Sequence, residues 1–170
     1  IAPFAQYQTK VYPKDLMEEV ILKLSRTPKH KIFLFGGGKQ EIELLNEMQQ
    51  NIENVIVLAG KLSFEEELTV IQNLNVMLSM DSGNAHIAAM FGVPVVSLWG
   101  QTHPFAGFTP FNQPQENSLT ANREKYPLIP TSIYGNKEIP GYENAMRSIL
   151  PESIISRLQL ILNKTSHENN

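Results

Sequence analysis

The stretch that decides the fold is residues 80–90, which read Met-Asp-Ser-Gly-Asn-Ala-His-Ile-Ala-Ala-Met. An apolar run typical of a buried strand precedes it, and small apolar residues at helical spacing continue it. This pattern predicts a strand-to-helix corner, where backbone N–H groups and the positive end of the helix dipole can receive an anion. His86 would lie on the first turn of that helix, within reach of the anion. The plainer alternative is that Asp81 or Ser82 only caps the helix and that Gly83 only makes the turn.

The rest of the chain repeats this strand–turn–helix unit. Short apolar runs predict strands over 1–5, 32–35, 55–58, 76–79 and 95–99, with 118–121 as a candidate sixth. Amphipathic patterns predict helices over 13–24, 39–49, 63–74, 84–91 and 151–162. The helix at 63–74 opens with a capping box from Ser63 to Glu66. Strands that are apolar throughout are typical of a sheet covered on both faces. The sequence therefore predicts an α/β fold, with a Rossmann-like parallel sheet and helices on both of its faces.

We expect residues 1–162 to form a single domain and residues 163–170 to form a frayed polar tail. The segment 100–117 reads as a long ordered loop, because Phe105, Phe108 and Phe111 need burial. The segment 126–142 is punctuated by Pro and Gly and predicts irregular structure.

Composition limits the possible functions. A chain of 170 residues with 42% hydrophobic residues can bury a real core, and its net charge of −3 offers no broad basic surface for nucleic acid. No run approaches the roughly 18 apolar residues of a transmembrane helix. The absence of cysteine excludes disulfide scaffolds, zinc ribbons and thiol nucleophiles, which fits a cytoplasmic protein. Because the sequence starts without Met inside an apolar run, we expect it to be part of a longer protein.

Polar or glycine-rich residues follow each of the first five predicted strands. Ligands of open α/β sheets bind beyond the carboxyl ends of the strands, so these residues are the candidates for a binding site. The groups, in chain order, are Lys10, Gly36–Gly38, Gly60 with Lys61, Asp81–His86 and Gly100–His103. Each alone has a plainer explanation as a solvated loop lysine, a turn glycine or a surface histidine. No nucleophile–base order, carboxylate pair or metal-binding cluster stands out, so the sequence predicts binding groups without a catalytic centre of their own.

Two segments carry a family resemblance. Residues 81–89, Asp-Ser-Gly-Asn-Ala-His-Ile-Ala-Ala, and residues 100–104, Gly-Gln-Thr-His-Pro, resemble the paired motifs of glycosyltransferase family 9, the lipopolysaccharide heptosyltransferases that use ADP-heptose. Residues 10–13 and 60–66 are similar to two weaker elements of that family. The family fold is GT-B, in which two Rossmann-like domains enclose the active site. The resemblance covers residues 1 to about 105 and fits the C-terminal, nucleotide-sugar-binding domain.

The resemblance implies roles for particular residues. Lys10, Ser82, Gly83 and His86 would surround the donor diphosphate, and Asp81 would place the loop or contact the donor sugar. Leu62 and its neighbour Lys61 would lie near the adenine. The residue types alone indicate that Gly37 and Gly38 either let the backbone approach the sugar or base of a ligand or form a flexible turn. The acid that binds the ribose in the family has no counterpart at residues 38–40, although Glu41 is close. The segment 130–146 resembles one that carries several cysteines in some relatives, and here it has none.

From these patterns we predict the donor-binding half of an inverting, metal-independent glycosyltransferase of lipopolysaccharide core synthesis. The donor would be a nucleotide-sugar of the ADP-heptose type, and no separate cofactor is expected. The catalytic base and the site for a lipid-linked saccharide acceptor would belong to an N-terminal domain outside this sequence. The full-length protein would be cytoplasmic, with a peripheral position at the inner face of the cytoplasmic membrane left open. Two alternatives are a non-catalytic Rossmann-like nucleotide-binding module and an epimerase of the same architecture, which would need catalytic acids within this half.

Overall fold

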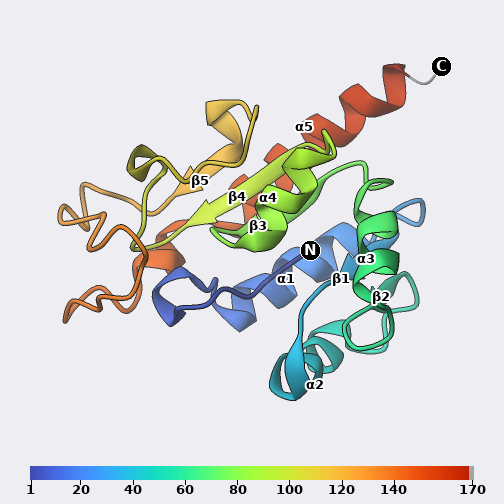
Figure 1. Cartoon of the computed structure of the whole chain (residues 1–170), viewed down its shortest axis with the longest axis horizontal. Helices are drawn as coiled ribbons and strands as arrows, with labels where there is room; N and C mark the ends of the chain where they lie inside the picture. The colour runs from blue at the N-terminus through green and yellow to red at the C-terminus, as the bar shows by residue number, and fades with distance from the viewer. Residues whose placement is uncertain (169–170) are drawn as a thin grey trace.

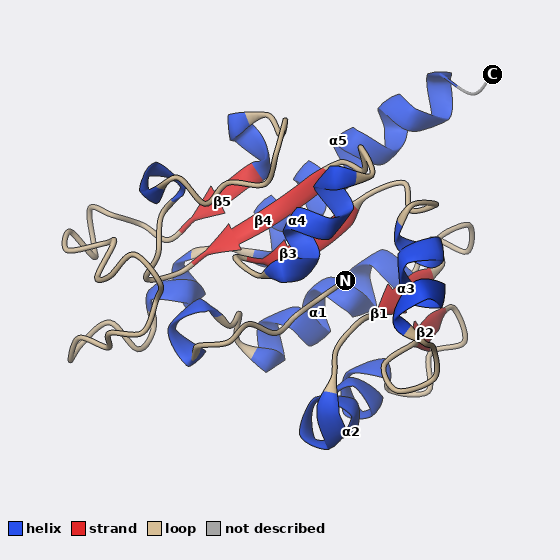
Figure 2. Ribbon diagram, viewed as in Figure 1, coloured by secondary structure: helices blue, strands red, loops and turns tan. Residues whose placement is uncertain are grey.

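The computed structural model describes residues 1–168 (Figure 1). Its strands all pair in parallel and are short, as Figure 2 shows in red. They are β1 (Ile32–Leu34), β2 (Val55–Val57), β3 (Met77–Met80), β4 (Val95–Trp99) and β5 (Ser118–Thr120). The first two form one sheet and the last three form another, in the order β3-β4-β5. The predicted strands after the first are therefore confirmed, including the candidate sixth.

The start of the chain joins the two sheets. The N–H of Ala2 donates to Leu78 O of β3 at 2.8 Å, and the N–H of Phe35, just after β1, donates to Ile1 O at 2.9 Å. The strand predicted over 1–5 is reduced to an isolated bridge between Ala2 and Ser79, so its predicted length was wrong. Pro3 explains the difference, because it has no N–H with which to extend the ladder. The sheet edge that carries the candidate site is nevertheless continuous from β2 to β5.

Helices cover both faces of the sheets, as predicted. They are α1 (Lys14–Ser25), α2 (Gly38–Gln49), α3 (Phe64–Ile71), α4 (Gly83–Met90) and α5 (Pro151–Glu168). Side chains alternate along β1, so that Leu34 joins a core with α1, α2 and α5, whereas Phe33 packs against a second core with α3 and α4. The predicted capping box is present, since Ser63 and Glu66 each accept the other's backbone N–H. Burial on both faces explains why the strands read as apolar throughout.

The last helix is longer than predicted. We expected it to end at Leu162 and a polar tail to follow, but α5 continues to Glu168. Residues 163–168 contain neither Gly nor Pro, and each residue added to an existing helix gains a backbone hydrogen bond. Residues 169 and 170 of the expected tail lie outside the described part of the chain.

The segment after β4 contains short turns of 3₁₀-helix, η2 (Pro104–Ala106) and η3 (Gln115–Asn117), and later η4 (Ala145–Ser148). Residues 126–142 are irregular, as expected. The expectation that Phe105, Phe108 and Phe111 are buried was wrong, because Phe105 and Phe111 are 74% and 75% exposed and Phe108 is 39% exposed. Their rings lie on turns at the surface, and the small core beneath this region is built from other residues, such as Tyr126 and Ile129.

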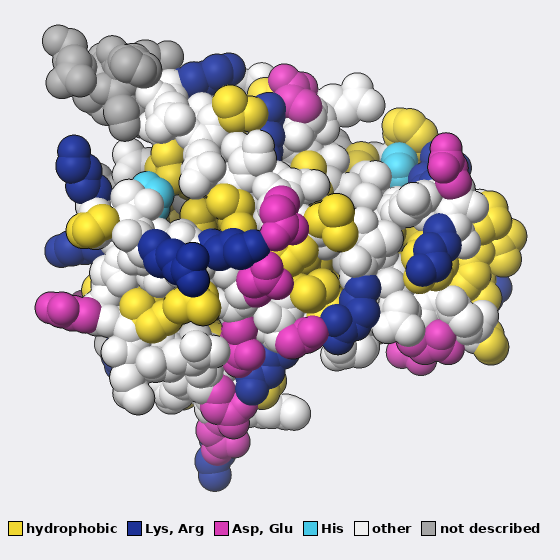
Figure 3. Space-filling model, turned by 180° about the vertical axis from the view of Figure 1, so that it is seen from behind, with side chains coloured by type: hydrophobic (Ala, Val, Ile, Leu, Met, Phe, Trp, Pro, Cys, Tyr) yellow, Lys and Arg dark blue, Asp and Glu magenta, His cyan; other side chains and the backbone are white. Residues whose placement is uncertain are grey.

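Charged side chains of both signs share the outer surface of α1. Lys23 forms ion pairs with Glu19 and with Glu152 of α5, and Asp15 pairs with Arg147 through two bonds of 2.8 Å. Figure 3 shows basic and acidic groups intermixed over the middle of the face that it draws. This surface therefore offers no continuous positive field to a polyanion.

Candidate functional site

The corner after β3 is held by charged and polar side chains from three separate segments. Asp81 is 7% exposed, and its Oδ2 lies 3.0 Å from Lys10 Nζ. The same oxygen accepts a hydrogen bond of 3.0 Å from Thr102 Oγ1. Lys10 ends the short 3₁₀ turn η1 (Gln8–Lys10), and Thr102 follows β4. The corner thus brings the ends of the first, fourth and fifth predicted strands together, as expected for parallel strands.

The plainer explanation of Asp81 and Ser82 as helix caps is wrong. Ser82 occupies the N-cap position of α4, but no side chain caps the helix there. The hydroxyl of Ser82 bonds instead to that of Ser79 at 3.0 Å, and the Asp81 carboxylate is engaged by Lys10 and Thr102. The Ala85 N–H donates to Ser82 O at 3.2 Å, whereas the N–H groups of Gly83 and Asn84, which open the helix, are left available to an anion.

Gly83 keeps the space in front of this helix open. A Cβ built on it meets no atom within 4 Å, and its backbone angle is not in the left-handed region. No turn geometry therefore demands glycine here, and what its hydrogen provides is clearance at the helix N-terminus. His86 lies one turn along α4 and is half-buried, and its side chain makes no hydrogen bond among the described residues.

The first three residues of the segment 100–104, Gly100, Gln101 and Thr102, each support this corner. Gly100 has no room for a side chain, because an added Cβ would collide with the Thr9 carbonyl oxygen and would lie 2.8 Å from Met146 Cγ. The N–H of Gln101 donates to Thr9 O at 3.1 Å. The motif therefore lets the chain that carries Lys10 pack directly on the end of β4, while Thr102 holds the carboxylate.

Tyr12 anchors the same segment from the other side. It is 1% exposed and its hydroxyl donates to Ile149 O at 2.7 Å, next to the start of α5. Burial, together with the nearby carboxylates of Glu19 and Glu152, raises the pKa of this phenol well above its usual value, so Tyr12 stays a neutral donor. The aromatic residue two places after Lys10 is thus a structural support for the lysine.

A cavity of about 400 Å³ opens beside the corner, between the end of β1 and the N-terminus of α4. Its lining includes Gly36, Gly37, Ser82 and Gly83, together with the carboxylate-bearing Glu41. Glu41 Oε2 accepts the N–H of Gly37 at 2.7 Å, which places an acid at the glycine corner although none stands at residues 38–40. The structure therefore brings Gly37 together with Ser82 and Gly83.

Other predicted residues lie around the cavity rather than in its lining. Gly38 opens α2 with a left-handed φ of 76°, and Lys61 is exposed in the turn after β2. Leu62 is half-buried and packs against the core that α3 and α4 share. The structure does not bring these three residues into contact with the Lys10–Asp81 pair.

Two further residues lie at the site without having been proposed for it. Glu67, on the first turn of α3, lines the cavity, and burial raises the pKa of its carboxyl group. Gly135 lies against Lys10 and Thr102. The helical period of residues 63–74 could have placed Glu67, but nothing local in the sequence marks Gly135, which is 125 positions from the lysine.

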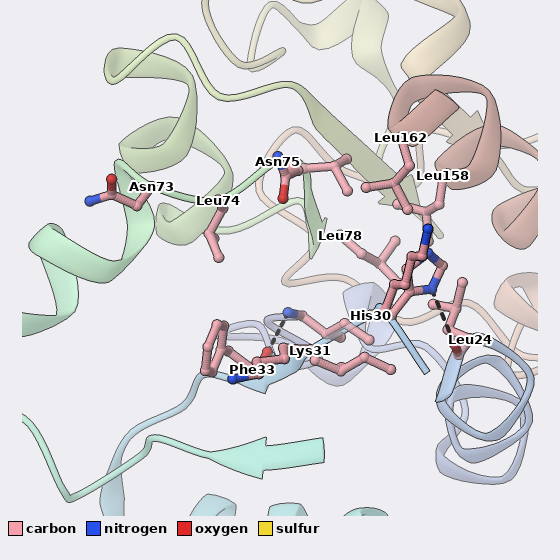
Figure 4. A pocket seen from close by; sticks show the side chains of 14 residues that line it. Leu24, His30, Lys31, Phe33, Asn73, Leu74, Asn75, Leu78, Leu158 and Leu162 are labelled. Carbon is pink, nitrogen blue, oxygen red and sulfur yellow. Dashed lines mark hydrogen bonds between the residues drawn. The ribbon is translucent and has the colours of Figure 1, made fainter. Parts of the chain in front are cut away.

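A second cavity lies at the opposite, amino-terminal edge of the strands (Figure 4). It measures about 350 Å³, and Figure 4 shows leucine side chains from α1, β3 and α5 along one wall, with His30 held by Leu24 O at 3.2 Å. None of the predicted site residues lines it. Since ligands of open α/β sheets bind at the carboxyl ends of strands, we assign the site to the other edge.

Two absences among the described residues bear on alternative sites. Among residues 1–164, whose side chains the structure describes, no group of three or more His, Cys, Asp or Glu residues is placed to hold a metal ion. No helix within residues 1–168 is both long and apolar enough to cross a membrane.

Fold and site together define a parallel α/β domain with a polar cleft at the carboxyl ends of its strands. Comparison with known proteins gives the family: residues 1–138 match the model of glycosyltransferase family 9 (heptosyltransferase), and the chain belongs to this family. Lipooligosaccharide heptosyltransferase 2 of Haemophilus influenzae is 30% identical over 142 residues, which are 81% of this chain and 39% of that protein. The enzyme of the same name from Campylobacter jejuni is 26% identical, over 93% of this chain and 48% of its own length.

Solved structures agree on the fold. E. coli heptosyltransferase WaaC with ADP aligns with a TM-score of 0.71 and 19% identity, covering 94% of this chain and 42% of that one. E. coli ADP-heptose lps heptosyltransferase II aligns with a TM-score of 0.72 and 21% identity, covering 97% and 46%. The predicted α/β fold is confirmed, and the chain spans less than half the length of these relatives.

Proposed function

We propose that this chain is the C-terminal, donor-binding half of an inverting, metal-independent glycosyltransferase of lipopolysaccharide core synthesis. The observation that carries the proposal is the packing of Lys10 and Asp81 beside the uncapped N-terminus of α4. Membership of glycosyltransferase family 9 and the names of the relatives support a heptose donor. The donor we propose is ADP-heptose, and WaaC was solved with ADP.

The diphosphate would lie at the N-terminus of α4. An ammonium group has three donors, and the Lys10 ammonium uses one or two of them on Asp81, so at least one remains for an anion. Lys10, the first N–H groups of α4 and His86 would together stabilise the charge that develops on the departing ADP. This is electrostatic catalysis of leaving-group departure, and it needs no metal.

The nucleoside would occupy the cavity between Gly37 and Gly83. Clearance at both glycines admits a flat ligand, and the Glu41 carboxylate is the acceptor that ribose hydroxyls require. The catalytic base and the lipid-linked saccharide acceptor would belong to an N-terminal domain, in an enzyme located peripherally at the inner face of the cytoplasmic membrane. We therefore expect residues 1–170 alone to transfer no sugar, and turnover of ADP-heptose by this chain would contradict its assignment as half of an enzyme.

Calorimetry of ADP and adenosine tests the binding proposal. ADP should bind more tightly than adenosine, because each charge-assisted contact to the second phosphate contributes on the order of 1–3 kcal/mol. Lys10→Ala should remove most of that preference and leave adenosine binding nearly unchanged, while the helix N-terminus preserves a remainder. Lys29→Ala is the matched control, since it removes the same charge at the opposite edge of the sheet.

The rival is a non-catalytic nucleotide-binding module. It shares the ADP preference but predicts no transferase activity when the chain is studied within its full-length protein. Equal affinity of the wild-type chain for ADP and adenosine would refute both, because the corner would then have no diphosphate site.

A further inference from the structure

The irregular segment 131–137 lies over the lysine of the candidate site. The N–H of Thr131 donates to Gln101 O at 2.9 Å, which fastens the segment to the residue beside Thr102. The hydroxyl of Thr9 donates to the carbonyl of Gly135, which fastens it to the residue before Lys10. The segment is thus hydrogen-bonded to the residues next to Lys10 and next to Thr102, although it lies more than 120 positions from Lys10 in the sequence.

The contact at Gly135 is made by bare backbone. A Cβ on this residue would lie 2.5 Å from Lys10 Cδ and 2.8 Å from Lys10 Cγ, and 3.1 Å from Thr102 Cγ2. These atoms of Lys10 form the middle of its aliphatic stem, so an added methyl group would force the whole side chain to move. The Lys10 side chain is only 13% exposed, and this packing is part of what confines it.

Confinement matters because a free lysine populates many rotamers, and a ligand that recruits it must work against that entropy. A lysine whose stem is already fixed presents its ammonium at no further entropic cost. We propose that Gly135 is a positioning residue: its backbone packs on the Lys10 stem and holds the ammonium between Asp81 and the site of the donor diphosphate. This inference rests on the proposed function, in which Lys10 contacts the diphosphate.

A plainer reason for glycine at 135 is its left-handed backbone, with a φ of 81°. Gly141 separates the two explanations. It lies in the same irregular region with a φ of 88°, but an added Cβ there meets nothing within 4 Å. Gly135→Ala and Gly141→Ala therefore impose similar backbone strain, and only the first pushes on Lys10.

Calorimetry of ADP and adenosine with both variants is the test. Gly141→Ala should bind both ligands as the wild type does. Gly135→Ala should weaken ADP binding by about tenfold, the loss of one charge-assisted contact, and should change adenosine binding less than about twofold. Equal ADP affinities of the two variants would overturn the proposal.

A double-mutant cycle shows whether the effect passes through the lysine. In a Lys10→Ala background, Gly135→Ala should cause no further loss of ADP affinity, because the group that it displaces is gone. The same tenfold loss in that background would overturn the proposal. If Lys10→Ala by itself leaves ADP binding unchanged, the proposed function fails, which is a different outcome from a failure of Gly135→Ala alone.

Thr9→Val provides an independent variant should Gly135→Ala not fold. It deletes the hydroxyl that ties the segment down, and it adds no bulk against Lys10. We expect a loss of ADP affinity of a few-fold with unchanged adenosine affinity, and wild-type binding of ADP by Thr9→Val would count against the proposal.

Discussion

The two glycine-bearing corners of the cleft are built in opposite ways. At the end of β3 and β4, Asp81 and Thr102 are buried, bonded to each other and packed against chain segments from both ends of the sequence. At the end of β1, a Cβ added to Gly37 or Gly38 would meet no atom within 4 Å, and the Gly37 N–H makes a local hydrogen bond to Glu41. The comparison indicates that the proposed anion half of the site is preformed by long-range packing, whereas the proposed nucleoside half is open.

Removal of the buried Asp81 carboxylate is the variant for which we expect the largest loss of stability. Asp81→Ala would leave the Lys10 ammonium nearly buried without its partner, and we expect the free energy of unfolding to fall by about 3 kcal/mol. Asp15→Ala removes an exposed carboxylate from Arg147 and should cost no more than about 1 kcal/mol. Urea unfolding measures both variants, and similar losses for the two would show that the corner is not a preformed unit.

A methyl group added to each corner should have different effects on the free energy of unfolding. Gly100→Ala forces a Cβ against the Thr9 carbonyl and Met146, and overpacking of this kind costs about 1–3 kcal/mol. Gly37→Ala has open space and an extended backbone with φ of −144°, so its stability should change by less than about 1 kcal/mol. Thermal unfolding of the pair checks this order, and a reversed order would contradict the contrast.

A variant of Glu41, the acid in the open corner, tests whether this corner binds the ribose and not the phosphates. Glu41→Gln keeps an oxygen for the Gly37 N–H but loses the carboxylate. If that carboxylate accepts ribose hydroxyls, the affinities for adenosine and ADP should both fall by about fivefold, the worth of one modest hydrogen bond. The ratio of the two affinities should stay as in the wild type, in contrast to Lys10→Ala. A changed ratio would mean that Glu41 acts on the phosphates.

The smallest expected effect concerns pH. Burial, reinforced by the charge of Arg123, lowers the pKa of His103, whose Nδ1 accepts the N–H of Phe105 at 3.2 Å. The unfolded chain takes up a proton near pH 6.5, before the folded chain does, so acidification below that value should reduce stability until the folded pKa is passed. His103→Asn retains an acceptor for Phe105 and should lose less stability between pH 7.5 and 5.5. Parallel stability curves for the two proteins would contradict this.

The order of helices and strands followed from local patterns, and so did the edge of the sheet that carries the site. The two largest errors in the bounds of these elements came from one proline and from the absence of a stop signal, while α3 ended at Ile71, three residues before its predicted end. Pro3 reduced the first strand to a bridge, and the absence of Gly and Pro let α5 run past Leu162. Phe105 and Phe111 are exposed although burial was expected. A hydrophobic side chain gains free energy from burial, but its residue type does not show whether another part of the chain lies close enough to cover it.

The sequence by itself determined the alternation of strand and helix, because each period reflects which faces must be buried. It also marked Asp81–His86, since a strand end, a glycine and a helix start are all local features. Only the tertiary structure decided that Asp81 binds Lys10 and Thr102 rather than capping α4, and that Gly135 packs on the lysine. Those contacts join segments 21 to 125 positions apart, and which distant groups meet is set by the packing of the whole sheet, which no local pattern encodes.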